Sequence, residues 1–433
     1  MIIRSKDMCV DAQTIGGCLE EFMREVRPRL MRLYDAYEGK GAITRRIRGQ
    51  GLPNNRLSHA FPRYITTMAA GYLTGRPIQY GGDQEEGVQM LRRLYGACDV
   101  DSVDAELARD ASICGKGICI VYADEMARPR AATLDPRQAF VVYDDTVEHR
   151  ALLGVHFYAR RGETGRPEGM HIYAYTPDAC LHWTSRANAG PSGEPEWTSS
   201  FFDSVPMVEF WNNADERGDF EPVLSLIEAY DQLESDRMND KQQFTDAILL
   251  LTGCVLENDD PDDARTPAQK LIEEKTLSLP DSDAKAQWLV KQSDEAGTEI
   301  FKNALRADIH KMSMVPDLTD EQFAYNSSGV AMRYKLLGLE QLTADKERWF
   351  REGLRCRLRL FARYMQLTSM AQLDPERVTM TFTRSLPVNE SEAAQTVALL
   401  HGIVPDEVLF TQLPFMEDAM KLRGIKGEKE ETD

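Results

Sequence analysis

The strongest constraint on the fold of this chain is a stretch that reads as one continuous helix. It runs from Ser328 to Met365, which predicts about 38 helical residues and a length of about 57 Å at 1.5 Å per residue. Apolar side chains recur at every third or fourth position, and only Lys346 interrupts the row. The row consists of Met332, Leu336, Leu339, Leu342, Phe350, Leu354, Leu358, Phe361 and Met365. A rod of this length predicts an elongated subunit.

The composition is that of a folded protein with more than one core. The chain has 433 residues, of which 42% are hydrophobic and 28% charged. A net charge of −19 opposes binding of nucleic acid through a basic surface. No signal peptide and no apolar run of membrane-spanning length is visible, so we expect synthesis in the cytoplasm. The eight cysteines form no CxxC pair, which predicts reduced thiols.

Several shorter elements precede the long helix. Residues 16–37 follow the helix period, and a further helix is predicted near Phe61 to Leu73. From about Gly117 to Asn212, short runs rich in β-branched and aromatic residues alternate with turn signals. This spacing predicts an antiparallel sheet.

Two more helices are expected in the second half of the chain. Pro222 suits the first turn of a helix that we expect to reach about Leu251, and another is predicted from about Glu295 to Met312. The middle of the first helix, Ser235 to Gln243, offers only Met238 to a core. A helix that is polar all round needs support from neighbours, so we expect it to lean on copies of itself in an oligomer.

The chain carries no local motif for catalysis. It lacks the GxxxxGK[ST] loop of nucleotide hydrolases, and no Ser-His-Asp or Cys-His grouping is apparent. His149, His156, His171 and His182 fall in the β-rich region without the close spacing of zinc ligands. We therefore expect no cofactor and no metal, although a single sequence does not reveal a site formed by distant residues.

Two charged loops stand out. Arg45, Arg46, Arg48 and Arg56 form the main basic cluster, which either pairs with acidic neighbours in the same chain or makes a subunit or phosphate contact. The second loop lies between two predicted helices, after Pro316, and is acidic.

Taken together, the motifs resemble those of the Gp6-like (SPP1-type) portal proteins of tailed bacteriophages. The resemblance covers about Tyr34 to Leu413. It rests on Tyr37 and Gly39, PNNR at 53–56, HAFPRYI at 59–65, GYLTGRPIQY at 71–80, LDP at 134–136, VVYDD at 141–145, SDRMND at 235–240, FTDAILLLTG at 244–253 and NSSGVAMRYKLLGLE at 326–340.

The resemblance implies an α+β portal fold with long helices and a β-rich wing subdomain, assembled as a ring that typically has twelve subunits. It divides the chain into a wing (1–221), a first stem helix (222–251), a clip (252–293), a second stem helix (294–313), a tunnel loop (314–328), a wing spine helix with its following strand (329–385), and a reduced crown with a C-terminal tail (386–433).

The resemblance also implies a function without enzymatic activity. The ring would form the channel at the capsid vertex through which double-stranded DNA is packaged and ejected. Its partners would be the terminase large subunit, which hydrolyses ATP, the scaffold and major capsid proteins, and the head-completion proteins. No membrane partner is implied. The protein would reside in the virion, and in the host cytoplasm during assembly.

The resemblance assigns candidate site residues as well. The DNA-facing tunnel loop would present Asp317, Asp320, Glu321, Ser327 and Ser328. The stem would line the channel with Arg237, Lys241, Lys302, Arg306 and Lys311. The basic cluster itself makes Arg45, Arg46, Arg48 and Arg56 the candidates for a subunit contact. Two alternatives stay open: a soluble enzyme with a non-local active site, and another ring-shaped virion connector.

Overall fold

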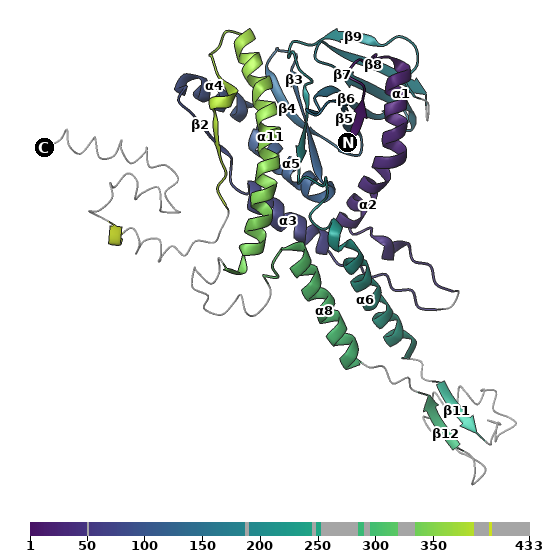
Figure 1. Ribbon diagram of the computed structural model, residues 1–433. Helices are drawn as coiled ribbons and strands as arrows, with labels where there is room; N and C mark the ends of the chain where they lie inside the picture. The colour runs from purple at the N-terminus through teal and green to yellow at the C-terminus, as the bar shows by residue number, and fades with distance from the viewer. Residues whose placement is uncertain are drawn as a thin grey trace. The chain divides into compact units, whose positions relative to one another are not determined.

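The computed structural model describes residues 1–49, 52–186, 190–244, 248–252, 285–289, 295–318, 334–384 and 398–400. Helices and sheets are mixed in these residues and no closed barrel forms among them, so the predicted α+β class is confirmed. The chain divides into two compact units (Figure 1). The first comprises Met1–Glu38, Ala60–Leu224 and His310–Asp433, and the second comprises Gly39–His59 and Ser225–Ile309.

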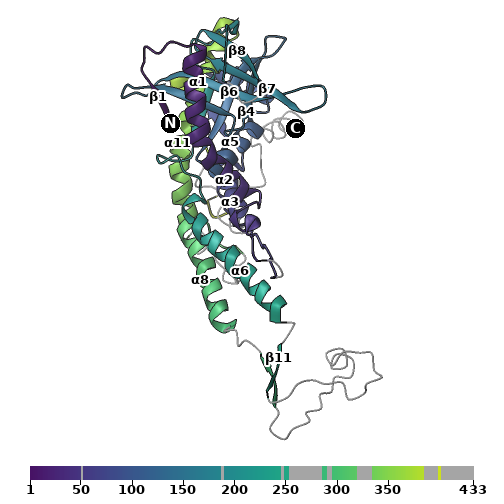
Figure 2. The same cartoon turned by 90° about the vertical axis from the view of Figure 1, so that its right-hand side faces the viewer.

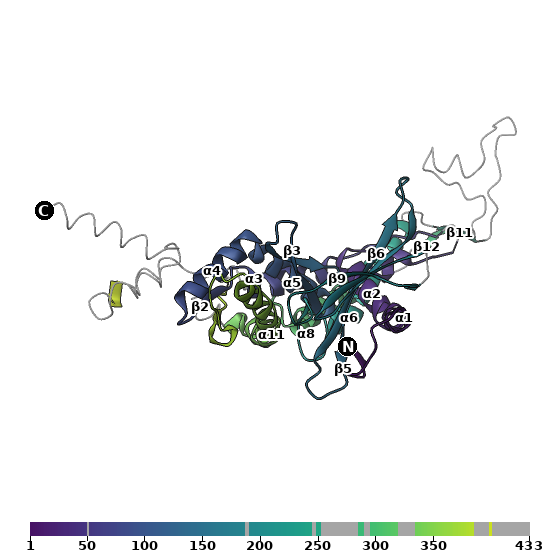
Figure 3. The same cartoon turned by 90° about the horizontal axis from the view of Figure 1, so that it is seen from above.

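The first unit contains a six-stranded sheet with helices along one side. The strand order is β1-β5-β6-β7-β8-β9, and only the β1–β5 pair is parallel. Helices α1 (Ala12–Glu21) and α2 (Arg27–Tyr37) follow one side of this sheet (Figure 3), and a π-helical turn, Phe22–Val26, joins them. The ring of Phe22 stacks on Phe140 of the sheet at 4.7 Å. The strands are β1 (Ile2–Arg4), β5 (Ala139–Asp144), β6 (Ala151–Arg161), β7 (Pro167–Tyr175), β8 (Ala179–Arg186) and β9 (Glu196–Ser199).

A second sheet in this unit corrects the prediction of one antiparallel meander. Strands β10 (Met207–Trp211), β3 (Lys116–Ala123) and β4 (Pro129–Leu134) form a separate three-stranded sheet. The last predicted strand pairs with the first, with Phe210 opposite Gly117, instead of continuing from its neighbour in sequence. Alternation of apolar residues identifies strands but does not specify such a non-local pairing.

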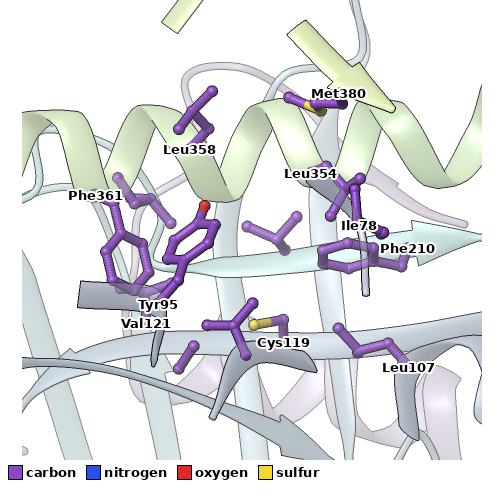
Figure 4. Packing of buried hydrophobic residues seen from close by; sticks show 14 of the residues in the cluster. Ile78, Tyr95, Leu107, Cys119, Val121, Phe210, Leu354, Leu358, Phe361 and Met380 are labelled. Carbon is purple, nitrogen blue, oxygen red and sulfur yellow. The ribbon is translucent and has the colours of Figure 1, made fainter. Parts of the chain in front are cut away.

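A long helix covers the three-stranded sheet and forms the main core with it. Figure 4 shows Leu354, Leu358 and Phe361 of α11 (Leu337–Leu367) above Phe210 and Cys119 of the strands. A Cβ atom at Gly353 would lie 2.7 Å from the Phe210 ring, so glycine is needed for this close approach. The unit also contains α3 (Phe61–Thr74), α4 (Glu85–Ala97), α5 (Val100–Cys114), and β2 (Gln79–Gly81) paired with β13 (Thr379–Thr381).

Helix α11 is shorter than predicted. It has 31 residues and begins at Leu337, whereas the sequence pattern predicts one helix from Ser328. The chain turns at Leu336, whose ψ of 0° leaves the helical range, and residues 319–333 lie outside the described part. Periodicity continues through this turn because Leu336 is itself buried, so the break is not visible in the apolar row.

Three buried ion pairs hold the first unit together. Lys346, which interrupts the apolar row of the long helix, contacts the buried carboxylate of Asp219. Arg357 on the same helix binds Asp104 of α5 through two hydrogen bonds of 2.6 and 3.1 Å. The third pair joins two strands and consists of Lys116 and Glu209. The polar interruption of the row is therefore a paired core residue.

The buried carboxyl group of Asp110 on α5 makes the stability of the first unit depend on pH. Burial raises the pKa of Asp110 to about 6 from 3.8, although Arg109 acts against the rise. A raised folded-state pKa means that ionisation disfavours folding, a cost that is absent below about pH 3.8 and complete above about pH 6. Asp110→Asn is thus expected to raise the melting temperature at pH 7.5 by more than at pH 4.5. Equal shifts at both pH values in scanning calorimetry would contradict this.

The second unit is built on two helices and a small sheet. Helix α6 (Leu224–Phe244) is followed by β11 (Ile248–Thr252), which pairs with β12 (Lys285–Leu289), and α8 (Glu295–Ser313) begins in this unit. The prediction of α8 is confirmed. The prediction that the preceding helix reaches Leu251 is wrong, because the apolar run ILLLT is a strand, and short apolar runs fit either element.

Candidate functional site

Two candidate sites stand out, each within one unit: the α6–α8 helix pair of the second unit, and the loop root at 310–318 in the first unit. The two helices lie side by side (Figures 1 and 2). Ile227 and Tyr230 of α6 are buried, as are Leu305 and Ile309 of α8. These positions repeat at three- and four-residue intervals, so each helix has one narrow buried apolar face.

Charged groups join the two helices of the pair. The guanidinium of Arg237 on α6 reaches Glu295 and Glu299 of α8 at 3.0 and 2.8 Å. Lys302 approaches Glu299 at 2.6 Å, and Lys241 approaches Glu295 at 3.8 Å. Lys302 and then Arg237 lower the pKa of Glu299 by hydrogen bonding. Three of the five predicted channel-lining cations are therefore paired with glutamates of the same chain.

Arg306 and Lys311, the other two predicted channel-lining residues, are exposed on α8. Lys241 is also largely accessible, with 57% of its side chain exposed. A channel-lining role for any of the five residues stays a prediction.

The polar middle of α6 has partners in its own chain. Asp231, Ser235 and Asn239 are buried along one side of the helix. They accept hydrogen bonds from the backbone N–H groups of His59, Leu57 and Asn55, at 2.9, 2.9 and 2.7 Å respectively. We call this segment, Leu52–His59, the strap.

The spacing of the two elements explains the fit. Every second residue of an extended chain advances by about 6.6 Å, and every fourth residue of a helix by about 6 Å. One N–H group of the strap therefore meets one side-chain acceptor per helical turn. The prediction that the polar segment 235–243 leans on copies of the chain is corrected for Ser235 and Asn239, because both have partners in the same chain. Met238, in contrast, is 47% exposed.

The predicted basic cluster lies next to the strap. Arg46 and Arg48 both contact the carboxylate of Asp236, the former at 2.8 Å. Arg56 donates to the carbonyl of Thr44 at 2.9 Å. Arg45 ends the 3-10 turn Ala42–Arg45. Arg46 and Arg48 thus pair with an acidic neighbour in the same chain, which is the first of the two alternatives. A subunit contact stays a prediction for all four arginines.

The root of the predicted tunnel loop is held by side chains of the first unit. His310 Nδ1 lies 3.0 Å from the carbonyl oxygen of Val315. The hydroxyl of Tyr64 donates to the carbonyl of Pro316 at 2.8 Å and accepts from the N–H of Leu318 at 3.2 Å. Both side chains therefore bind the backbone of residues 315–318.

Asp317 is the predicted tunnel-loop residue whose surroundings are described. Its carboxylate lies 3.7 Å from His310 Nε2, and 21% of its side chain is exposed. Asp320, Glu321, Ser327 and Ser328 lie outside the described residues. Sequence reasoning missed both the His310–Tyr64 contacts and the strap. Polar residues at 231, 235 and 239, spaced by four on a helix, are the signal that could have predicted a covering segment.

Further features bear on alternative functions. Within the described ranges, no group of three or more His, Cys, Asp and Glu side chains could hold a metal ion. None of the described helices is both long enough and apolar enough to span a membrane. The cysteines at 9, 18, 98, 114, 119, 180 and 356 are free thiols, whereas Cys254 lies outside the described part.

The family of the chain follows from its similarity to known sequences. The profile described as "Phage portal protein, SPP1 Gp6-like" matches residues 19–433, nearly the whole length. The chain therefore belongs to the SPP1 Gp6-like family of phage portal proteins. Members of this family are structural components of the virion.

Two curated relatives agree with this assignment. The chain is 24% identical over 381 residues to the portal protein of Bacillus phage SPP1, and the match covers 84% of this chain and 74% of that protein. It is 22% identical over 387 residues to the portal protein of Clostridium phage phiCD119, covering 84% and 82%.

Proposed function

We propose that copies of this chain form a ring, typically of twelve subunits, that surrounds a channel for double-stranded DNA at the capsid vertex. The observation that carries the proposal is the family match over residues 19–433. The helix pair α6–α8 supplies the stem in this proposal, and residues 252–293 the clip. The β-rich part of the first unit and α11 form the wing, and residues 386–433 a reduced crown and tail.

The charge of the chain fits a channel that DNA passes without sticking. Twelve copies at −19 each carry about −228 in total, which repels phosphate on average. Exposed cations of α8, such as Lys311, offer weak phosphate contacts at the wall. In this proposal the terminase large subunit docks on the ring and supplies the ATP hydrolysis. Scaffold and major capsid protein surround the ring, and head-completion proteins close it.

The ring is tested by negative-stain electron microscopy and native mass spectrometry of one purified sample. Rings with a central hole and a mass near twelve or thirteen subunits support the proposal. A monomer or dimer that persists on concentration overturns it and favours the alternative of a soluble enzyme. Another ring-shaped virion connector would also form rings, and failure of these rings to bind terminase would favour that connector.

The role of the loop 314–328 is tested by removing its acidic side chains. Asp317, Asp320 and Glu321 replaced together by alanine are expected to lower the yield of DNA-filled heads severalfold, because the wall loses charge that repels DNA. Rings should still assemble. The matched control replaces Asp259, Asp260 and Asp262, which changes the net charge equally at another place in the sequence. Unchanged packaging by the loop variant would contradict the assignment.

A further inference from the structure

Helix α8 presents an apolar surface on the side that faces away from α6. Ile300 and Phe301 are 71% and 54% exposed. With 3.6 residues per turn, both lie on the opposite side of the helix from Glu295, Glu299 and Lys302, which face α6. Two large apolar side chains exposed side by side on one helix would gain from being covered by a partner. We call Ile300, Phe301 and the exposed residues Ala304 and Asp308 the outer face of α8.

The strap and the loop before it carry a second apolar surface in the same unit. Ile47, Leu52 and Leu57 are 88%, 51% and 39% exposed. Arginine is enriched at protein interfaces, and Arg48 and Arg56 lie between these three positions in sequence. Because the strap is fixed to α6 by its ladder of hydrogen bonds, little conformational entropy would be lost when a partner binds.

We infer that the outer face of α8 in one copy docks on the Ile47–Leu57 surface of the next copy. This inference rests on the proposed ring and identifies its contact within the second unit. The two surfaces differ, and they lie on different sides of α6. The strap binds the side of α6 that carries Asp231 and Asn239, whereas α8 contacts the side that carries Arg237. A contact between two unlike surfaces of the same subunit is heterologous, and repetition of such a contact generates a ring when the rotation between neighbours closes.

Charge favours a second copy as the occupant of both surfaces. Arg46 and Arg48 share the single carboxylate of Asp236, which leaves one positive charge in excess beside Ile47. Asp308 provides an exposed carboxylate on the outer face of α8. DNA would not select this outer face, because phosphate binding needs cations and both Ile300 and Phe301 are uncharged.

The test is cysteine cross-linking in assembled rings. Cys9 and Cys356, which are exposed, are first replaced by serine. Ile300→Cys is then combined in turn with Ile47→Cys, Leu52→Cys or Leu57→Cys, and each variant is treated with a flexible bismaleimide. We expect at least one pair to give a ladder of covalent oligomers that extends to the closed ring. Each variant that carries only one introduced cysteine should give no ladder, and neither should Ile300→Cys combined with Gln232→Cys, which is exposed on α6 and outside both surfaces.

The outcomes separate the contact from the ring itself. Rings without a ladder from any of the three pairs overturn the contact and leave the proposed ring intact. Absence of rings from the unmodified protein overturns both. As a second readout, Ile300→Lys with Phe301→Lys should shift the mass distribution from rings to monomers with unchanged circular dichroism. Asn303→Lys, on the flank of the same helix, should keep the rings, and equal behaviour of the two variants would also refute the contact.

Discussion

Replacing Arg357 with leucine is expected to lower the free energy of unfolding by about 3–5 kcal/mol, because the substitution leaves a buried carboxylate unpaired. The Arg357 side chain is completely buried and that of Asp104 is 3% exposed. Tyr95 and Phe210 place their rings 5.3 and 5.5 Å from the guanidinium carbon, so the surroundings offer little other compensation for the charge of Asp104. Urea unfolding followed by tryptophan fluorescence measures the loss.

The same pair predicts a non-additive result. Burial raises the pKa of Asp104 and Arg357 acts against this rise, so the pairing does not fully offset the desolvation of the Asp104 carboxylate. Replacing both residues with leucine should therefore cost much less than Arg357→Leu alone. The cost of the single variant should also fall at lower pH, where Asp104 becomes neutral.

The control for this experiment is two residues away on the same helix. Arg355 forms an exposed pair with Glu352, and 43% of its side chain is accessible. Arg355→Leu should change the free energy of unfolding by no more than about 0.5 kcal/mol. A loss in Arg357→Leu as small as in the control would contradict a structural role for the buried pair.

Much of the secondary structure is predictable from local pattern. The spacing of apolar residues locates α3 and α8 to within one or two residues, and it identifies the buried face of α11 through Leu354 and Phe361. Local pattern does not distinguish a helix from a strand where a short apolar run fits both. The ILLLT run continues a helical stretch in sequence but pairs as a strand with β12. Lys346 interrupts the apolar row in the sequence, but in the fold the carboxylate of Asp219 lies beside it and pairs with it in the core.

The candidate site is less predictable because its contacts are distant in sequence. Asn55 and Asn239 are separated by 184 positions, and Tyr64 and Pro316 by 252. Family resemblance assigned Arg237 and Lys302 to a channel without revealing that both pair with Glu299. Side-chain partners depend on helix rotation to within a fraction of a turn, which neither periodicity nor resemblance specifies.

Replacing Ser235 and Asn239 together with alanine is expected to release the strap without weakening α6. Alanine has a higher helix propensity than either residue, so the helix itself should persist. The N–H groups of Leu57 and Asn55 lose their acceptors, and an unsatisfied buried donor costs about 1–3 kcal/mol. A combined loss of about 3 kcal/mol would speed amide exchange of the strap about a hundredfold. Hydrogen exchange with mass spectrometry of peptides covering 52–59 measures this.

Comparison with a matched variant assigns the effect to the ladder. Gln232 is exposed on the same helix, and Gln232→Ala should leave exchange of the strap unchanged. If the double variant also exchanges at the rate of the unmodified protein, the strap is not held by these side chains. A released strap should in addition weaken ring assembly, because the Ile47–Leu57 surface would then lose conformational freedom on docking. Faster exchange with unchanged ring stability would separate the fold of the strap from its proposed contact.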